Sequence, residues 1–240
     1  MAARRRVGVL GGMGPEATVL FMQRVIERTE VTDDQDHVPL LVDNNPQVPS
    51  RVKAIVDGTG ADPGPVLAAM ARRLEAAGAE ALAMPCNTAH HFAPEIRGAV
   101  CIPFLDMVAL SARRLAEAGV RRVGILASPA IRITGVFERP LAEHGVAPLY
   151  DRGEEDALAA IRAVKVRDYE PARRTLATAA AAFERAGADA LLVACTEFSI
   201  LTEAARNVLP LVDTIDVLAE EVVAFSCAPA TVVNGLARKT

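Results

Sequence analysis

The two halves of this chain repeat three segments in the same order along the sequence. The most informative repeat is a helical stretch, a glycine, a short apolar strand and then a cysteine, which is Cys86 in the first half and Cys195 in the second. The repeated pairs are Val7–Leu10 with Val123–Leu126, Leu74–Leu82 with Phe183–Leu191, and Ile102–Asp106 with Leu209–Asp213. Chance explains one such match tolerably, because helix–glycine–strand punctuation is common. Three matches in the same order indicate two similar lobes.

Strand and helix signals alternate along the chain, which is typical of an α/β fold whose parallel strands are joined by right-handed crossovers. Proline and glycine mark several element ends, as at Pro15 before one helix and at Gly78 and Gly119 after two others. The expected strands are Val7–Leu10, Pro39–Asp43, Glu80–Met84, Cys101–Leu105 and Arg122–Ala127. The expected helices include Pro15–Arg28, Pro65–Ala77, Ser111–Ala118 and Ala157–Val166.

The repeat also predicts the domain organisation. We expect residues 1–105 to form the first α/β lobe and residues 106–213 to form the second. A helix within residues 214–240 is expected to pack back on the first lobe. A pseudo-two-fold axis between the lobes would place one cleft between them.

Composition narrows the function classes. Apolar residues make up 51% of the chain, which is enough for a substantial core, and the formal net charge of -4 argues against a nucleic-acid binder. No apolar run approaches the length of a membrane span. Met1–Arg6 is basic, but the apolar stretch after it is short and rich in glycine, so we expect no signal peptide and a cytoplasmic protein.

The four cysteines do not form a CxxC pair, so a zinc site is not expected, and a reducing cytoplasm disfavours structural disulfides. For Cys101 and Cys227 we expect small, buried apolar residues. Cys86 and Cys195 differ, because each follows a strand at an equivalent position of a lobe. Chemistry in open parallel sheets collects at the carboxyl ends of the strands, so these two thiols are expected to flank one cleft.

Two facing thiols can invert a carbon centre. A thiolate on one side removes a proton from the carbon, and a thiol on the opposite side delivers one, without a metal or an organic cofactor. Small polar residues follow each cysteine, Asn87-Thr88 and Thr196-Glu197, and backbone N–H groups at such loop or helix starts can hold a carboxylate. Because Asn87 and Thr88 follow Cys86 and His90 is near, we expect one thiol to be activated.

Other candidates have two interpretations from the residues alone. Gly11, Gly12 and Gly14 form a turn after the first strand, but their spacing is not the GxGxxG of a dinucleotide site. Arg51 and Lys165 would usually be interpreted as surface residues; the alternative is that they bind a substrate carboxylate. The remaining polar candidates are His90, which can pack or tune the Cys86 thiol, and Glu197, which can be a first-turn acid of a helix or a partner of the second thiol.

Four stretches together resemble the aspartate/glutamate racemase family, the amino-acid racemases that work without pyridoxal phosphate. They occur in the family's order and span nearly the whole chain: Gly11–Thr18, Asn45–Arg51, Met84–His90 and Ala194–Glu197. The resemblance implies two Rossmann-like lobes with the active site between them and no cofactor. It also implies that Cys86 and Cys195 are the acid/base pair and that the protein is a homodimer.

The resemblance assigns further residues one by one. Met13, Asn87, Thr88 and Thr196 are implied to line the substrate pocket, and Arg51 to bind a substrate carboxylate. Lys165 matches a family lysine that faces an acidic substrate, and Thr134-Gly135 resembles the hydroxyl–glycine pair of the second lobe.

Two positions depart from the family pattern. Ser50 stands where the family commonly has an aspartate, and Ile131 where it commonly has a threonine; both are expected near the pocket. Both changes bear on the identity of the substrate. Arg51 and Lys165 favour an acidic substrate, because two cations could hold a second carboxylate, so the leading hypothesis is an aspartate racemase, with a glutamate or broader-specificity amino-acid racemase as the alternative. A hydantoin racemase, a relative of the maleate isomerases and a small-molecule-binding protein without turnover are also considered.

Overall fold

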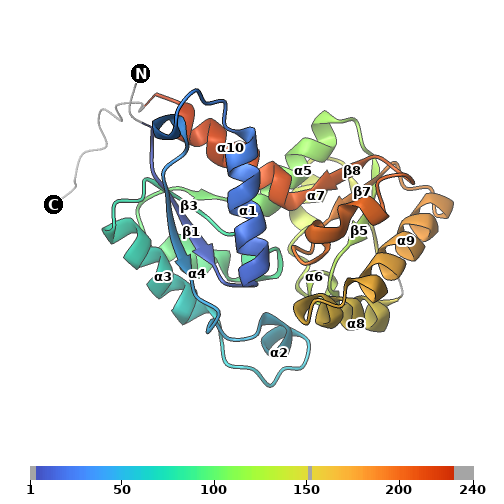
Figure 1. The fold of residues 1–240 in the computed structure, drawn as a ribbon. Coiled ribbons are helices and arrows are strands. Elements are labelled where there is room, and N and C mark those ends of the chain that lie inside the picture. The colour runs from blue at the N-terminus through green and yellow to red at the C-terminus, as the bar shows by residue number, and fades with distance from the viewer. Residues whose placement is uncertain (1–3, 151–152, 230–240) are drawn as a thin grey trace.

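The computed structural model describes residues 4–150 and 153–229, which fold into two α/β lobes side by side (Figure 1). Each lobe has a four-stranded parallel sheet, with the order β2-β1-β3-β4 in the first and β6-β5-β7-β8 in the second. The expected fold class is thus confirmed. The strands are β1 (Val7–Gly11), β2 (Leu40–Asn44), β3 (Ala81–Ala83), β4 (Phe104–Leu105), β5 (Arg122–Leu126), β6 (Ala147–Tyr150), β7 (Ala190–Val193) and β8 (Leu211–Asp213).

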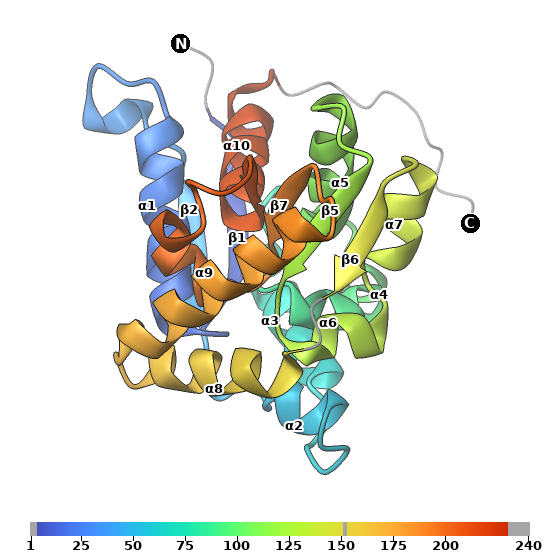
Figure 2. The ribbon, with the colours of Figure 1, turned by 90° about the vertical axis from the view of Figure 1, so that its right-hand side faces the viewer.

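Helices cover both faces of each sheet (Figure 2). The α-helices are α1 (Pro15–Arg28), α2 (Arg51–Ile55), α3 (Gly64–Ala76), α4 (Ala93–Ala99), α5 (Met107–Glu117), α6 (Pro129–Thr134), α7 (Glu138–Glu143), α8 (Glu154–Lys165), α9 (Tyr169–Arg185) and α10 (Thr214–Cys227). Three 3-10 segments complete the description: η1 (Asp34–Asp36), η2 (Thr88–Phe92) and η3 (Phe198–Ala204).

The sheets are buried because apolar residues of alternate strand positions pack on different helix layers. In the second lobe, Leu191 and Val193 of β7 face α8 and α9, whereas Leu192 faces α5 and α7. The first lobe repeats this pattern, with α1 and α10 on one face and α3 and α4 on the other. Strands buried on both faces need almost continuous apolar sequence, which the strand segments of this chain have.

Two helices change lobes. Helix α5 follows β4 of the first sheet but packs through Val108, Ala112 and Leu115 on the second lobe. Helix α10 follows β8 of the second sheet and packs on the first lobe beside α1 (Figure 1). Residues 230–240, the last part of the expected C-terminal segment 214–240, lie outside the described residues. The division of the chain into lobes at residue 105 remains our prediction.

Helix α5 begins four residues before the expected start. The Asp106 carboxylate accepts hydrogen bonds from the backbone N–H groups of Val108 and Ala109, at 2.9 and 3.0 Å, and so caps the helix. The expected helix started at Ser111, because Asp106 was not identified as its cap from the sequence. An N-terminal aspartate satisfies backbone donors that have no partner within the helix.

Burial of the two remaining cysteines was predicted incorrectly. Cys101 and Cys227 are both exposed. Cys101 lies in the bend before β4, and Cys227 is the last residue of α10, so neither reaches the packed faces of the sheet. Across the described residues, every helix is too short or too polar to cross a membrane.

Gly124 of β5 tests the packing of the second sheet. A Cβ atom built there lies 2.4 Å from the Phe183 ring of α9. The strand and the helix can therefore pack this closely only because glycine has no side chain. Gly124→Ala should lower the free energy of unfolding by about 2 kcal/mol through overpacking. Chemical denaturation monitored by circular dichroism measures this change.

Gly98→Ala is the matched control, because a Cβ atom at Gly98 in helix α4 meets nothing within 4 Å. We expect that variant to be unchanged or more stable by up to about 1 kcal/mol, since alanine favours helix over glycine. Equal destabilisation by the two substitutions would contradict the close packing of α9 on β5.

Candidate active site

Cys86 and Cys195 lie at equivalent positions, just beyond the carboxyl ends of β3 and β7. Both are buried, with 5% and 6% of their surface exposed. Both line one cleft of about 950 Å³, whose wall contains residues of both lobes. The structure thus brings together two thiols that are more than 100 residues apart in the sequence.

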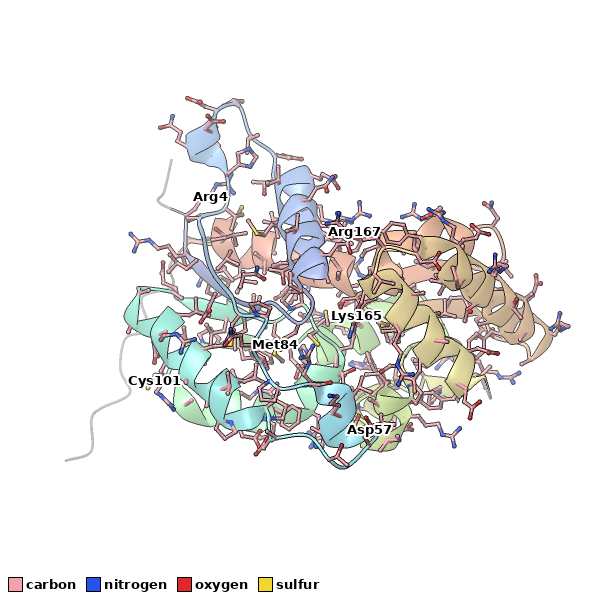
Figure 3. All side chains as sticks on the ribbon, turned by 60° about the horizontal axis from the view of Figure 1, so that its bottom comes forward. Arg4, Asp57, Met84, Cys101, Lys165 and Arg167 are labelled. Atoms are coloured by element: carbon pink, nitrogen blue, oxygen red, sulfur yellow. The ribbon has the colours of Figure 1, made fainter. Side chains whose placement is uncertain are left out.

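The cleft wall divides the other candidate residues into two groups. Met13, Arg51, Thr88, Lys165 and Glu197 line the cleft with the two cysteines. Lys165 ends α8 and, with Arg167, lies where the second lobe meets the first (Figure 3). The remaining candidates are Asn87, His90, Thr134 and Thr196, which lie behind the wall or away from it.

Arg51 is held rigidly at the start of α2. Its guanidinium donates hydrogen bonds to the carbonyl oxygens of Met13, at 3.1 Å, and Pro49, at 3.2 Å. The Nε atom is buried and has no partner among the described residues. Ser50, which departs from the family pattern, caps this helix by accepting a hydrogen bond from the Lys53 N–H, at 3.3 Å. The segment 45–51 therefore presents a preorganised positive charge to the cleft.

Burial dominates the acid–base properties of both thiols. It raises the pKa of Cys86, against which the positive charge of Arg51 acts, while the Glu197 carboxylate adds to the rise. The pKa of Cys195 is raised well above its usual range by burial and by Glu197, whose Oε2 lies 3.3 Å from Sγ. Without substrate, removal from water outweighs the favourable charges at both thiols, and the activation of one thiol remains a prediction that the labelling experiment below tests.

Glu197 also contacts the cation of the second lobe. Its Oε1 lies 3.7 Å from the Lys165 Nζ, whose side chain is about half exposed. Cys195, Glu197 and Lys165 thus form a row that leads from the buried thiol towards solvent. Such a row gives the Cys195 proton a short route to a carboxylate.

His90 contacts the backbone of the Cys86 loop. Its Nε2 accepts a hydrogen bond from the Met107 N–H, at 3.2 Å, so the ring proton is on Nδ1, which donates to the Cys86 carbonyl, at 2.8 Å. Burial lowers the His90 pKa and keeps the ring neutral. Because both ring nitrogens bind backbone groups, His90 positions the loop and does not reach the thiol.

Two predicted pocket positions of the second lobe lie elsewhere. The Thr134 hydroxyl donates to the Ala130 carbonyl of its own helix, at 2.7 Å, and Ile131 is fully buried in the lobe's core. Ser128 lines the cleft instead, and its hydroxyl lies 3.4 Å from that of Thr88 in the first lobe. The repeat of Val7–Leu10 in Val123–Leu126 carried this signal, because it aligns Ser128 with Gly12.

A second contact between the lobes lies at the cleft mouth. The Tyr169 hydroxyl of α9 donates to the Glu16 carboxylate of α1, at 2.8 Å, and Glu16 lines the cleft. Sequence reasoning missed both residues, since nothing local distinguishes them from surface residues. Among the described residues, no three His, Cys, Asp or Glu side chains are grouped so that they could hold a metal ion.

Comparison with known proteins agrees with this geometry. The sequence model of the Asp/Glu/hydantoin racemase family matches residues 10–222. The chain belongs to this family. Its fold is similar to that of Picrophilus torridus aspartate racemase, with 30% identity and a TM-score of 0.85 over 92% of this chain and 94% of that one. The racemase is also 25% identical to the broad specificity amino-acid racemase RacX of Bacillus subtilis, over 90% of this chain and 96% of that protein.

More distant members share the fold. The glutamate racemase of Francisella tularensis aligns with a TM-score of 0.67 and 16% identity over 92% of this chain and 80% of that one. This protein is accordingly an isomerase of the racemase type that acts on a small molecule, and the cleft between its lobes is the candidate active site.

The thiol environments predict the pH dependence of alkylation. A raised pKa keeps a thiol protonated near neutral pH, so iodoacetamide should label both cleft cysteines only in alkaline solution, and Cys86 at lower pH than Cys195. Glu197→Gln removes the carboxylate charge and should shift Cys195 labelling to lower pH. Site-resolved peptide mass spectrometry separates these signals from the exposed Cys101 and Cys227.

Glu203→Gln is the control, because Glu203 pairs with Arg173 in the same lobe outside the cleft. It should leave the labelling profile unchanged. Labelling of Cys195 at neutral pH in the wild type would contradict the assigned environment.

Proposed function

We propose that this racemase inverts the Cα of an amino acid by a two-cysteine mechanism without a cofactor, and that aspartate is its substrate. The observation that carries the proposal is the pair of buried thiols, Cys86 and Cys195, that reach one cleft from equivalent strand ends of two lobes. Inversion needs a base and an acid on opposite faces of the same carbon, and the reverse reaction exchanges their roles.

Both thiols start protonated, because burial raises both pKa values, but the neighbouring charges differ. The Arg51 charge favours a thiolate at Cys86, whereas Glu197 favours a protonated thiol at Cys195. A substrate ammonium adds positive charge to the cleft and so favours the thiolate further. Cys86 first releases its proton to solvent, the resulting thiolate removes the Cα proton, and Cys195 donates its proton to the opposite face of the carbanion. Turnover leaves a thiol at Cys86 and a thiolate at Cys195, and Glu197 helps to restore the starting state.

Substrate binding follows from the polar groups around the thiols. We assign Arg51 to a substrate carboxylate, because its guanidinium is held in place and its Nε is buried without a partner among the described residues. The backbone N–H groups after each cysteine, at Asn87 and Thr196, are assigned to the other carboxylate oxygens. Thr88 and Met13 complete the pocket wall, and Lys165 supplies a second positive charge.

A broader substrate range is the second candidate. Apolar side chains of both lobes line the cleft, including Val48, Val52, Ile161, Val164 and Ile200. In addition, Glu197 partly neutralises Lys165, and Ser50 replaces the family's aspartate. These features suit uncharged side chains as well as acidic ones, which agrees with the similarity to a broad specificity racemase.

Deuterium uptake at Cα tests the proposed reaction. Single enantiomers of aspartate, glutamate and a panel of neutral amino acids are incubated in heavy water, and the products are separated by chiral chromatography. We expect the newly formed enantiomer of aspartate to carry deuterium at Cα, because the second cysteine equilibrates with solvent. Exchange of neutral amino acids at a similar rate would establish the broader range, and no exchange of any amino acid would overturn the proposal.

The two thiols are tested by substitution. Cys86→Ser and Cys195→Ser should each lower inversion by at least about 1,000-fold, since a hydroxyl is a far weaker acid than a thiol. Cys101→Ser and Cys227→Ser are matched controls, because both cysteines are exposed outside the cleft. Ligand binding that all four variants retain, without turnover in the wild type, would favour a binding protein.

Other family chemistries give different signals in the same experiments. A relative of the maleate isomerases would form a covalent adduct on one cysteine, which mass spectrometry of the trapped enzyme detects. A hydantoin racemase would invert hydantoins in place of free amino acids. The homodimer and the cytoplasmic location remain predictions, and light scattering of the purified protein tests the first of them.

A further inference from the structure

The junction between β8 and α10 contacts both cysteine loops. Asp213 ends β8 of the second sheet, and Thr214 begins α10, which packs on the first lobe. The chain therefore crosses from one lobe to the other at this dipeptide. Both residues are buried, and Thr214 has no exposed surface.

Thr214 bridges the two lobes with a single hydroxyl. It donates a hydrogen bond to the carbonyl of Val193, at 3.0 Å, and accepts one from the Asn87 Nδ2, at 2.9 Å. Val193 lies two residues before Cys195, and Asn87 directly follows Cys86. Because the hydroxyl proton is directed at a carbonyl, which cannot donate, the oxygen must accept from Asn87. This fixes the orientation of the Asn87 amide and leaves its Oδ1 without a partner among the described residues.

Asp213 fixes the same junction to the Cys195 loop. Its Oδ1 accepts hydrogen bonds from the Ser199 hydroxyl, at 2.8 Å, and from the Ile215 N–H, at 2.9 Å. The Ser199 N–H in turn donates to the Cys195 carbonyl, at 3.2 Å. One dipeptide is thus tied to the loop of each thiol by buried hydrogen bonds.

We propose that Thr214 is a positioning residue that sets the separation between the Cys86 and Cys195 thiols. This inference rests on the proposed function, because two-sided proton transfer requires both sulfur atoms within hydrogen-bond reach of one carbon. The Thr214 hydroxyl connects the residue after one cysteine to the strand end that carries the other. Without it, the Cys86 loop loses a direct hydrogen bond to the second lobe.

The repeat shows that this bridge is specific to one junction. The equivalent dipeptide of the first lobe is Asp106-Met107, in which methionine replaces the threonine. There the Met107 N–H donates to His90, which holds the Cys86 loop within its own lobe. Thr214 thus adds a contact between lobes that the sequence repeat does not require, between the residue after Cys86 and the strand end before Cys195.

The test compares Thr214→Val with Thr214→Ser. Valine keeps the shape and removes the hydroxyl, and serine restores it. For Thr214→Val we expect a decrease in kcat for inversion of about 100-fold, as for a misplacement of about 1 Å, with KM changed by less than about 3-fold. Return of a hydrogen from the first thiol, after that thiol has exchanged with heavy water, should become more frequent, so the ratio of Cα deuterium exchange to inversion should rise. Thr214→Ser should recover most of both values.

Thr29→Val is the matched control. Thr29 is also buried, and its hydroxyl donates to the Val25 carbonyl, at 2.6 Å, at the end of α1 away from the cleft. Thr29→Val should lower the free energy of unfolding about as much as Thr214→Val does, but it should leave the exchange-to-inversion ratio unchanged. The inference is overturned if Thr214→Val leaves kcat and the ratio unchanged, or lowers exchange and inversion equally.

A measurement without turnover separates this inference from the proposed function. Bifunctional thiol reagents of graded span are applied to wild type and variants that carry Cys101→Ser and Cys227→Ser, and the Cys86–Cys195 cross-link is quantified by mass spectrometry. Wild type and Thr214→Ser should share a narrow optimum of span, and Thr214→Val should broaden or shift it. Identical profiles would overturn the role of Thr214, whereas a wild type that shows the optimum but inverts no amino acid would overturn only the proposed function.

Discussion

The exchange of α5 and α10 between the lobes determines how the two sheets face each other. Each helix follows the last strand of one sheet and buries its apolar side on the other lobe. The two helices also contact each other, through ion pairs such as Arg113 with Glu221 at 3.2 Å. With both crossings in place, the carboxyl ends of the two sheets cannot turn away from each other, and the loops after β3 and β7 share one cleft.

Near-symmetry of the backbone does not extend to the charges around the thiols. Arg51, from the first lobe, acts on Cys86, whereas Glu197, from the second, contacts Cys195. Burial raises the pKa of both thiols, and these opposite charges leave the pKa of Cys195 raised further than that of Cys86. The proposed mechanism uses each thiol in both states. The charge asymmetry holds the proton more firmly on Cys195 than on Cys86, and Lys165 lies 3.7 Å from Glu197, where it can moderate the carboxylate charge.

Much of this organisation was predictable from the sequence, because local signals and the repeat agree. Continuous apolar strands, glycine stops and Pro15 located most elements of the sheets and helices. The repeat placed Cys86 and Cys195 at equivalent strand ends. Helix α5 started earlier than expected, because Asp106, one residue after β4, caps it. The burial of Cys101 and Cys227 was predicted wrongly, because a residue type sets an average burial and not the burial of one position.

Within the site, the sequence predicted some of the cleft residues correctly and others incorrectly. Arg51 and Lys165 line the cleft as the family resemblance implied, but Thr134 bonds within its own helix and Ile131 lies in the core. Ser128 was missed, although the repeat aligns it with the glycine turn of the first lobe. Closeness in sequence did not predict the role of His90. It is four residues from Cys86, yet its two ring nitrogens form hydrogen bonds with backbone groups, the Cys86 carbonyl and the Met107 N–H.

By itself, the sequence determined the α/β class, the two similar lobes and the pair of cysteines, since periodicity, glycine stops and repeats act over short stretches of chain. Only the tertiary structure decided what surrounds the thiols: Arg51 beside one, Glu197 beside the other, and Thr214 between the loops of both. Glu197 is only two residues from Cys195, and its place in the sequence already made it a candidate partner of that thiol. Arg51 and Cys86 are tens of positions apart, and Asn87 and Thr214 are more than a hundred apart, so no local pattern specifies that these residues meet.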